Sequence, residues 1–502
     1  MSSFLVLPEN AFDLTRKASY DKIKCQDMGI FLFFLYFQVN YSNKEINMAK
    51  LRFHLAVIAA KCVQLAIRML GRNASHNPGV MALKICPNFM DLAPKAPLVI
   101  CVTGTNGKTT VSNLLTDALI ADGRKTVSNR TGSNIVPGCC TNLLNTLNWF
   151  GKCCKDAAVY EVDERASRLI LPHLKPDYLV VTGLFRDSLK RNAHPDYIFS
   201  VIDTYCPDST KLILNADELC CSMLKKNNDR VFYGIGKQAT DLTESINIVS
   251  DYALCPDCGE KLRYDYLRYH HIGHAVCPNC GFHSQDAKYL VTEINADAKT
   301  LTLSVDGKES TYPIINPILF NIYNQLTVTT TLLELGIPQE KVQEIVAKIQ
   351  VPDSRLNNVQ VNGVSVTQAM SKGQSCISSC RTFDFVSSQP GKKSVVLAMD
   401  DYYDRKKSVE YIGWIYDVDY EFMTREGVEQ VVAAGPWCYD HKVRLLLAGV
   451  SADKIVCAED ELAAMDLVDI ENTDSVYILY DTSTYDLSCK MKEKLLKRLE
   501  AK

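Results

Sequence analysis

The segment TGTNGKTT, over residues 103–110, has the residue types that bind nucleotide phosphates. Glycines permit a tight turn whose backbone N–H groups point at an anion, and a helix that begins directly after the turn adds the positive end of its dipole. A lysine reaches the outer phosphates, and the hydroxyl that follows it binds Mg²⁺. The segment predicts a nucleotide and Mg²⁺ site, with Lys108 at the phosphates and Thr109 at the metal, formed by Gly104, Thr105, Asn106, Gly107, Lys108, Thr109 and Thr110.

Two matched CPxCG segments, over residues 255–259 and 277–281, form a second candidate site. Each lets two thiolates reach one ion, and four thiolates suit a closed, tetrahedral Zn²⁺ site. Closed coordination indicates a structural role, and an iron centre with the same ligands is the alternative. The predicted ligands are Cys255, Cys258, Cys277 and Cys280. The neighbouring histidines are expected at the surface or around the site rather than on the ion: His270, His271, His274 and His283.

The elements that must hold these residues follow an α/β pattern. A β-branched run at residues 99–102 predicts a buried strand before the phosphate loop, and a helix is expected from about residue 108. Strand-like runs at AAVYEVD, YLVVTGLF and KLILNAD alternate with helical or loop segments, which indicates a mainly parallel sheet. Beyond the linker-like segment VPDSRLNN, four short apolar runs predict a smaller, second α/β domain.

The N-terminal region is interpreted separately. The apolar run at 30–39 is too short to span a bilayer, which needs roughly 20 residues in a helix. The helix that begins at Met48 is amphipathic and basic. It is expected to dock on the body, and peripheral contact with an anionic membrane surface stays open. The predicted parts of the chain are 1–47, an extension of doubtful status; 48–95, this helix and a connector; 96–350, the nucleotide-binding domain with a cysteine-containing insert at 251–285; and 351–502, the C-terminal domain.

The composition narrows the class of protein. The chain has 502 residues, of which 47% are hydrophobic, so it can form a large core. Its net charge of -3 gives no strongly basic field, and no nucleic-acid partner is expected. Its 20 cysteines include adjacent pairs such as Cys139–Cys140, which are untypical of a disulfide framework. A reducing cytoplasm is the expected location.

The phosphate loop resembles that of the Mur ligases, in which only two residues separate the glycines; Val102 stands where the common phosphate loop has its first glycine. The resemblance implies that ATP activates a carboxylate as an acyl phosphate, which an amine then attacks. Arg186 and Asp187, in LFRDSLKR, match a further family segment. Other family positions match as follows: the Mg²⁺-binding glutamate at Glu161, the adenine-contacting amides at Asn321 and Asn324, and the hinge between the ATP domain and the C-terminal domain at Asp353 and Arg355.

A cysteine ribbon inside the ATP domain, followed by WIYDVDYE at residues 414–421, resembles the MurT branch of that family. The resemblance implies amidation of the D-glutamate α-carboxylate of lipid II to D-isoglutamine at the inner face of the membrane. It also implies a partner, a GatD-type glutamine amidotransferase that supplies ammonia. In that branch an aspartate completes the partner's Cys-His triad. Here its ungapped position falls on Tyr411, and a short insertion would bring Asp404 or Glu410 to the same place.

Two alternative functions stay open at this stage. The first is a divergent Mur-type ligase for another carboxylate or amine; a folylpolyglutamate-type ligase fits less well because of the ribbon. The second is a zinc-ribbon ATPase that binds nucleic acid. Its sequence basis is a set of basic and aromatic residues between the two cysteine pairs: Lys261, Arg263, Tyr264, Tyr266, Arg268 and Tyr269.

Overall fold

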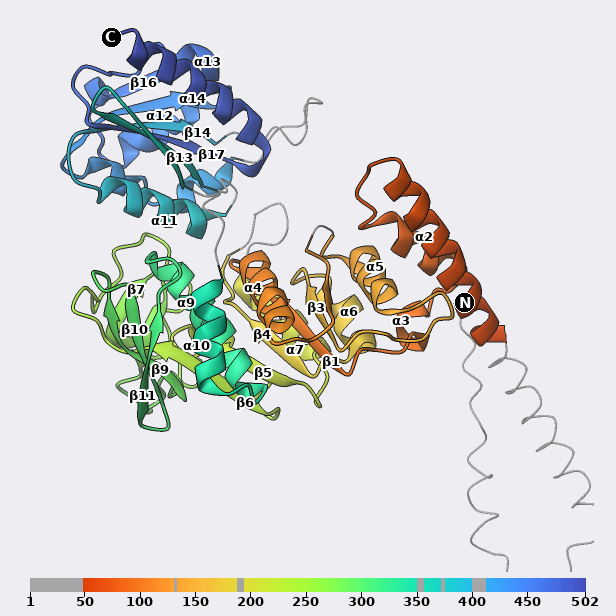
Figure 1. Ribbon diagram of the computed structural model, residues 1–502. Coiled ribbons are helices and arrows are strands. Elements are labelled where there is room, and N and C mark those ends of the chain that lie inside the picture. Colours follow the sequence, from red (N-terminus) through yellow and green to blue (C-terminus); the bar gives the residue numbers. More distant parts are fainter. Residues whose placement is uncertain (1–47, 131–132, 187–193, 350–355, 372–374, 400–411) are drawn as a thin grey trace, which may run out of the picture.

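The computed structural model describes residues 48–130, 133–186, 194–349, 356–371, 375–399 and 412–502 (Figure 1). A central body carries the C-terminal domain at one end and the N-terminal helix at the other. Several predicted residues lie outside the described ranges: the extension 1–47, Asp187, the hinge pair Asp353 and Arg355, and the triad candidates Asp404, Glu410 and Tyr411.

Within these ranges the central body has one sheet of nine strands, in the order β11-β10-β9-β6-β5-β4-β1-β3-β2. Within this sheet, neighbouring strands run parallel from β9 through β6, β5, β4, β1 and β3 to β2. Strands β10 and β11 extend the sheet beyond β9 and pair antiparallel. Their bounds are β1 Leu98–Thr103, β2 Thr126–Ser128, β3 Ala157–Glu161, β4 Tyr178–Val181, β5 Lys211–Asn215, β6 Arg230–Ile235, β9 Tyr289–Asn295, β10 Thr300–Val305 and β11 Lys308–Pro313.

Strand β1 shows why this sheet lies between two helical layers. All six of its residues are buried, and alternate side chains point to opposite faces. Ile100 and Val102 contribute to one core, whereas Val99 and Cys101 contribute to the other. The first face is covered by α4 Lys108–Ala121, α9 Leu319–Glu334 and α10 Gln339–Lys348. The second is covered by α2 Asn77–Ile85, α3 Phe89–Leu92, α5 Val136–Thr146, α6 Ser167–Leu174, α7 Pro195–Tyr205 and α8 Leu219–Ser222.

The chain leaves this sheet between β6 and β9 to form an insert. Its hairpin consists of β7 Arg263–Tyr269 and β8 Ile272–Val276, which pair antiparallel. The apolar core of the insert is small, and its buried members include Leu262, Ala275 and two of the cysteines. So small a core indicates that a further cross-link is needed to hold the insert folded.

The C-terminal domain is a second α/β unit, as predicted. Its described residues form a six-stranded sheet in the order β12-β13-β17-β14-β15-β16, parallel except for the hairpin β12–β13. The strands are β12 Leu356–Val361, β13 Val364–Met370, β14 Lys393–Ala398, β15 Val428–Ala434, β16 Ile455–Ala458 and β17 Ser475–Tyr480. The helices are α11 Cys376–Ser387, α12 Cys438–Leu447, α13 Glu461–Ala464 and α14 Tyr485–Glu500, with 3₁₀ turns η4 Gly413–Asp417, η5 Tyr420–Thr424, η6 Ala452–Lys454 and η7 Thr482–Thr484.

One boundary of this domain differs from the sequence interpretation. Residues 356–358 were expected in a linker, but they begin strand β12. The turn of the hairpin is formed by Asn362 and Gly363, whose φ values of 48° and 83° match the turn that Asn-Gly favours. The linker prediction was wrong here because the polar residues Asn357 and Asn358 are untypical of a strand. The Asn-Gly pair that indicates the hairpin turn begins four residues after Asn358.

The N-terminal helix, over residues 48–69, packs on the central body by one face. Phe53 lies against Phe89, with ring centroids 5.3 Å apart. Among the described helices, none is both long enough and apolar enough to cross a membrane.

Candidate active site

The phosphate loop joins the end of β1 to the start of α4, and two glycines are required by its path. Gly104 and Gly107 have φ values of 126° and 86°, which other residues rarely adopt. A Cβ atom at Gly104 would overlap the Thr182 hydroxyl, and one at Gly107 would overlap the Asn324 side-chain oxygen. The first turn of α4 carries neither an acidic residue nor a side-chain cap. Its backbone N–H groups are therefore available to an anion, and the loop fits a nucleotide phosphate.

Lys108 is held at this loop by a buried carboxylate. Its Nζ donates to the Gly104 carbonyl at 2.5 Å and lies 3.0 Å from Glu164 Oε1. Glu164 is 4% exposed, and burial raises the pKa of its carboxyl although the Lys108 charge opposes this. The sequence interpretation missed Glu164, although it stands in the same VYEVDERA segment as Glu161.

Glu161 ends strand β3 at the same edge of the sheet as the phosphate loop. It is aligned with Val102 of β1, two residues before Gly104. Its Oε1 accepts a hydrogen bond from Asn134 Nδ2 at 3.1 Å, and its backbone N–H donates to Asn129 at 2.8 Å. The exposed Thr109 lies in the first turn of α4, so hydroxyl and carboxylate oxygens, which Mg²⁺ prefers, lie at this one edge.

Of the two predicted asparagines on α9, Asn324 lies against the loop. It is 6% exposed and contacts Gly107. Its Nδ2 donates to Asn321 Oδ1 at 3.4 Å, so the two amides lie side by side one helical turn apart. Their contact with adenine stays a prediction; what the structure adds is that Asn324 limits the space around Gly107.

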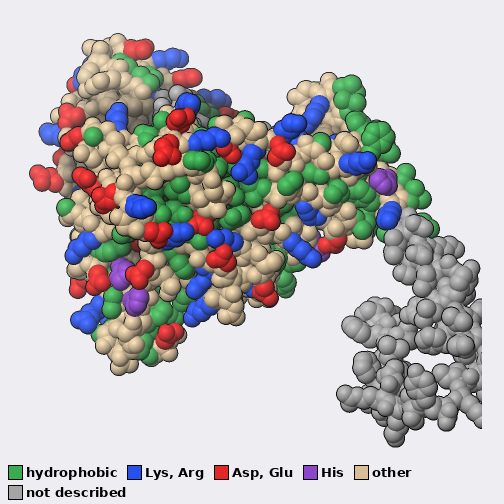
Figure 2. Space-filling view, turned by 60° about the horizontal axis from the view of Figure 1, so that its bottom comes forward, with side chains coloured by type: hydrophobic (Ala, Val, Ile, Leu, Met, Phe, Trp, Pro, Cys, Tyr) green, Lys and Arg blue, Asp and Glu red, His purple; other side chains and the backbone are tan. Residues whose placement is uncertain are grey.

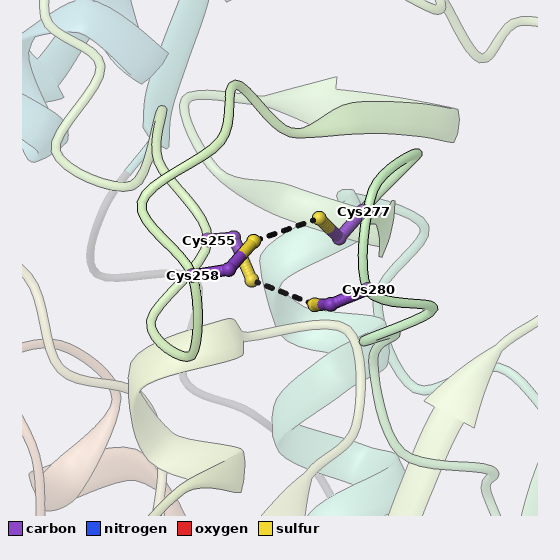
Figure 3. Close-up of side chains that lie close together, drawn as sticks. All are labelled: Cys255, Cys258, Cys277 and Cys280. Atoms are coloured by element: carbon purple, nitrogen blue, oxygen red, sulfur yellow. Dashed lines mark hydrogen bonds between the residues drawn. The ribbon is translucent and has the colours of Figure 1, made fainter.

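The four predicted cysteines converge on one point (Figure 3). The Sγ atoms of Cys255 and Cys280 are 3.6 Å apart, those of Cys258 and Cys277 are 3.5 Å apart, and all four lie within 4.8 Å of one another. Tetrahedral Zn²⁺ with Zn–S bonds of about 2.3 Å needs sulfur–sulfur distances of about 3.8 Å. The cluster therefore fits a zinc ion.

Two neighbouring acids anchor the insert to the central body. Glu218 is fully buried and accepts from Leu184 N at 3.1 Å, Cys221 N at 2.8 Å and His271 Nε2 at 2.9 Å. Asp217 lies 3.1 Å from Arg268 Nη1 and accepts from Tyr323 Oη at 2.6 Å. Tyr323 precedes Asn324, so a chain of contacts runs from the insert to the phosphate loop.

These contacts narrow two interpretations of the insert, the first being that its histidines lie at the surface or around the cysteine site. His270 and His271 are 2% and 1% exposed and so are not surface residues; they pack where the hairpin meets the body. Burial lowers the pKa of His270 to about 3, with the neighbouring His271 adding to this effect. The Arg268 side chain is 2% exposed and paired with acids, so it is not available to a basic-aromatic surface for nucleic acid.

The C-terminal domain contacts the central body and its insert through the two aspartates of WIYDVDYE. Asp419 accepts from Asn247 Nδ2 at 2.6 Å and from Ile248 N at 2.7 Å. Asp417 lies 3.4 Å from Arg186, which also pairs with Asp251 at 2.6 Å. In this structure the motif is therefore a contact between domains, which the sequence alone did not indicate.

Comparisons with known proteins agree with this architecture. Residues 377–485 match the family model described as MurT ligase C-terminal. The chain is 28% identical over 415 residues to the lipid II isoglutaminyl synthase (glutamine-hydrolyzing) subunit MurT of Staphylococcus aureus (strain COL), covering 80% of this chain and 89% of that protein. It is 25% identical over 457 residues to the subunit of the same name from Streptococcus pneumoniae (strain ATCC BAA-255 / R6), covering 89% and 98%.

Solved structures share the fold. A pseudomurein peptide ligase type C from Methanothermus fervidus matches with a TM-score of 0.62 at 17% identity, covering 81% of this chain and 80% of that one. The MurF ligase from Thermotoga maritima in complex with ADP matches with a TM-score of 0.54 at 13% identity, covering 84% of each chain. The predicted Mur ligase-type fold, and the resemblance to MurT proteins over most of the chain, are confirmed.

Proposed function

We propose that this protein is an ATP-dependent ligase that amidates the D-glutamate α-carboxylate of lipid II. One observation carries the proposal: a Mur-type phosphate loop with Lys108, Glu161 and Asn324 at one sheet edge, in a chain similar to lipid II isoglutaminyl synthase subunits. ATP and Mg²⁺ are the cofactors that this fold implies. The reaction is placed in peptidoglycan synthesis.

The chain's own residues bind and position ATP. The loop N–H groups and Lys108 would hold the phosphates, and Thr109 and Glu161 would bind Mg²⁺. In the structure described here Lys108 pairs with the buried Glu164. An arriving terminal phosphate competes for that ammonium, so Glu164 keeps the lysine at the loop between turnovers.

The reaction then proceeds in two steps. A carboxylate oxygen of the substrate attacks the terminal phosphorus, the bond to the ADP oxygen breaks, and an acyl phosphate forms. Ammonia attacks the carbonyl carbon, the carbon–oxygen bond to phosphate breaks, and the nitrogen loses a proton to give the amide. Holding these groups in line is the main contribution that a protein makes to such transfers.

The cysteine cluster has a structural role in this proposal. Zn²⁺ bound by Cys255, Cys258, Cys277 and Cys280 would supply the cross-link that the small core of the insert lacks. The insert in turn contacts the C-terminal domain through Asn247 and Asp419.

Ammonia is supplied by a GatD-type glutamine amidotransferase, with which this chain would form a heterodimer in the cytoplasm at the inner face of the membrane. The relatives' names support this, since they describe subunits of a glutamine-hydrolysing synthase. We assign completion of the partner's triad to Asp404, with Glu410 as the alternative.

The test uses the full chain co-expressed with any glutaminase encoded beside its gene. ATP hydrolysis and lipid II amidation are measured with glutamine or with ammonium chloride. We expect Lys108→Ala to abolish both activities and Lys226→Ala, an exposed lysine away from the loop, to leave them unchanged. If ATP is hydrolysed but neither nitrogen source gives amidated lipid II, lipid II is not the substrate, and the alternative of a divergent ligase remains. Undiminished hydrolysis in Lys108→Ala would reject the loop assignment.

A further inference from the structure

The N-terminal helix, residues 48–69, has two apolar faces, and only one packs on the body. Phe53, Ala56, Val57 and Ala60 are at most 6% exposed. A second set recurs at alternating spacings of three and four residues and is exposed to solvent. This outer stripe consists of Met48 (49% exposed), Leu51 (55%), Leu55 (51%), Ile58 (47%), Cys62, Leu65 (52%) and Met69 (74%).

The outer stripe is fixed facing away from the protein. At about 3.6 residues per turn, its positions lie on the side of the helix opposite Phe53 and Val57. The packed face is anchored by Gln64, whose Nε2 donates to Asn145 Oδ1 at 2.7 Å, and by Lys61, whose Nζ donates to the Leu144 carbonyl at 3.4 Å. The helix cannot turn its outer stripe inward without losing these contacts, so the stripe needs another partner.

The charged residues of the segment that carries the outer stripe are all basic. Residues 48–90 contain no aspartate or glutamate, although the chain as a whole carries a net charge of -3. The basic residues in this range are Lys50, Arg52, Lys61, Arg68, Arg72 and Lys84. Figure 2 shows green hydrophobic side chains along the outer edge of this arm, with blue basic side chains beside them. This pattern fits a partner that is apolar inside and anionic at its surface.

An exposed aromatic pair extends the same surface. Trp149 and Phe150 are 49% and 76% exposed, in the loop that packs beside this helix. The ammonium of Lys61 lies 5.9 Å from the Trp149 ring centre, and Gly151 lies against Phe53. Tryptophan beside basic residues is typical of surfaces at the boundary between lipid headgroups and acyl chains.

We propose that the outer stripe, with Trp149 and Phe150, docks this protein on an anionic lipid bilayer. A second copy is a poorer occupant, because the positions flanking the stripe carry Arg52, Lys61 and Arg68 without an acid to pair with them. The biological reason for docking on a bilayer rests on the proposed function, whose substrate is lipid-linked. The surface itself is independent of the reaction.

The experiment measures vesicle co-sedimentation of the zinc-loaded full chain without lipid II. Binding to mixed phosphatidylcholine–phosphatidylglycerol vesicles is expected, with much weaker binding to phosphatidylcholine alone. The double variant Leu55→Glu/Ile58→Glu should bind the mixed vesicles at least about tenfold more weakly. The matched control is Val443→Glu/Leu447→Glu, since these side chains are 49% and 69% exposed on α12 of the C-terminal domain. It should bind like the wild type.

A double variant that removes two positive charges tests the electrostatic contribution to vesicle binding. Arg68→Gln/Arg72→Gln should weaken binding to the mixed vesicles by about fivefold per residue and lower its salt dependence. Unchanged binding by Leu55→Glu/Ile58→Glu would overturn the proposal, as would a vesicle-free dimer that this variant splits into monomers. Amidation of lipid II in detergent, measured on the same variants, reports on the proposed function separately and should be retained.

Discussion

The buried pair of Asp217 and Arg268 gives the sharpest test of how the insert is held. Their side chains are 4% and 2% exposed and lie 3.1 Å apart. Burial raises the pKa of Asp217, and the Arg268 guanidinium opposes that shift. Asp217 also accepts hydrogen bonds from Ile235 N at 2.8 Å and from Tyr323 Oη at 2.6 Å. The substitution Asp217→Asn keeps the shape of this side chain and removes its charge.

The expected loss of stability in Asp217→Asn depends on the charges that remain around Arg268. Removing one partner of a buried ion pair costs about 3–5 kcal/mol, because the other charge is left buried. Asp241 stays 3.1 Å from Arg268 Nη2 and offsets part of that loss, so we expect the low end, about 3 kcal/mol. At about 1.4 kcal/mol per factor of ten, this corresponds to local opening that is about a hundredfold more frequent.

Hydrogen–deuterium exchange measured by mass spectrometry reports this opening on peptides that contain β6 and β7. The matched control is Asp229→Asn: Asp229 is 68% exposed and pairs with Lys211 at 3.0 Å, so its loss should cost less than about 1 kcal/mol. The double variant Asp217→Asn/Arg268→Gln should cost less than the sum of the single variants by about 1–3 kcal/mol. Additive costs, or unchanged exchange in Asp217→Asn, would refute the argument that these two charges stabilise the insert.

Three further predictions concern other parts of the molecule. Cys258→Ser should abolish zinc binding, measured by metal analysis, and speed proteolysis of the insert, whereas Cys154→Ser should do neither. Gly107→Ala should weaken ATP binding at least about tenfold by calorimetry, because its Cβ meets Asn324; Gly123→Ala, with a φ of 96° but open space around it, should not. Burial raises the pKa of Glu334, but hydrogen bonds from two lysines and a tyrosine outweigh this and lower the pKa from 4.5 to about 2. Glu334→Gln should therefore cost about 2–3 kcal/mol near pH 7, with the difference from wild type in thermal unfolding narrowing as the pH falls from about 4.5 to about 2.

Each of these predictions has an outcome that contradicts it. Full zinc content in Cys258→Ser would show that the cluster does not act as one four-thiolate site. Equal ATP affinities of the two glycine variants would mean that the contact between Gly107 and Asn324 does not limit ATP binding. The native carboxylate of Glu334 contributes stability above its unfolded pKa and loses it on acidification; a difference that widened at low pH would have the wrong sign.

The structure gives the insert a connecting role that deepens the proposed mechanism. On one side Arg268 reaches Asp217 and Tyr323, next to the asparagine that contacts the phosphate loop. On the other side Asn247 and Ile248 bind Asp419 of the C-terminal domain. Loss of zinc should therefore affect ATP binding and domain contact together, although the cysteines lie in neither site.

The sequence by itself determined those features whose information is local. The order of glycine, lysine and threonine after a β-branched run predicted a strand, a loop and a helix, because neighbouring residues alone set that turn. Two CPxCG segments predicted the cysteine cluster, since each brings its own pair of thiols together. Apolar runs alternating with helical spacers predicted two α/β domains for the same reason.

Only the tertiary structure decided which distant side chains meet. Glu164 pairs with Lys108 across 56 positions, and Tyr323 with Asp217 across 106, and no periodicity in the sequence specifies such partners. The pattern of the N-terminal helix showed that it is amphipathic and basic. It could not show which apolar face the body covers, because both faces have suitable spacing. The packing of Phe53 against Phe89 settles that choice and leaves the outer stripe exposed.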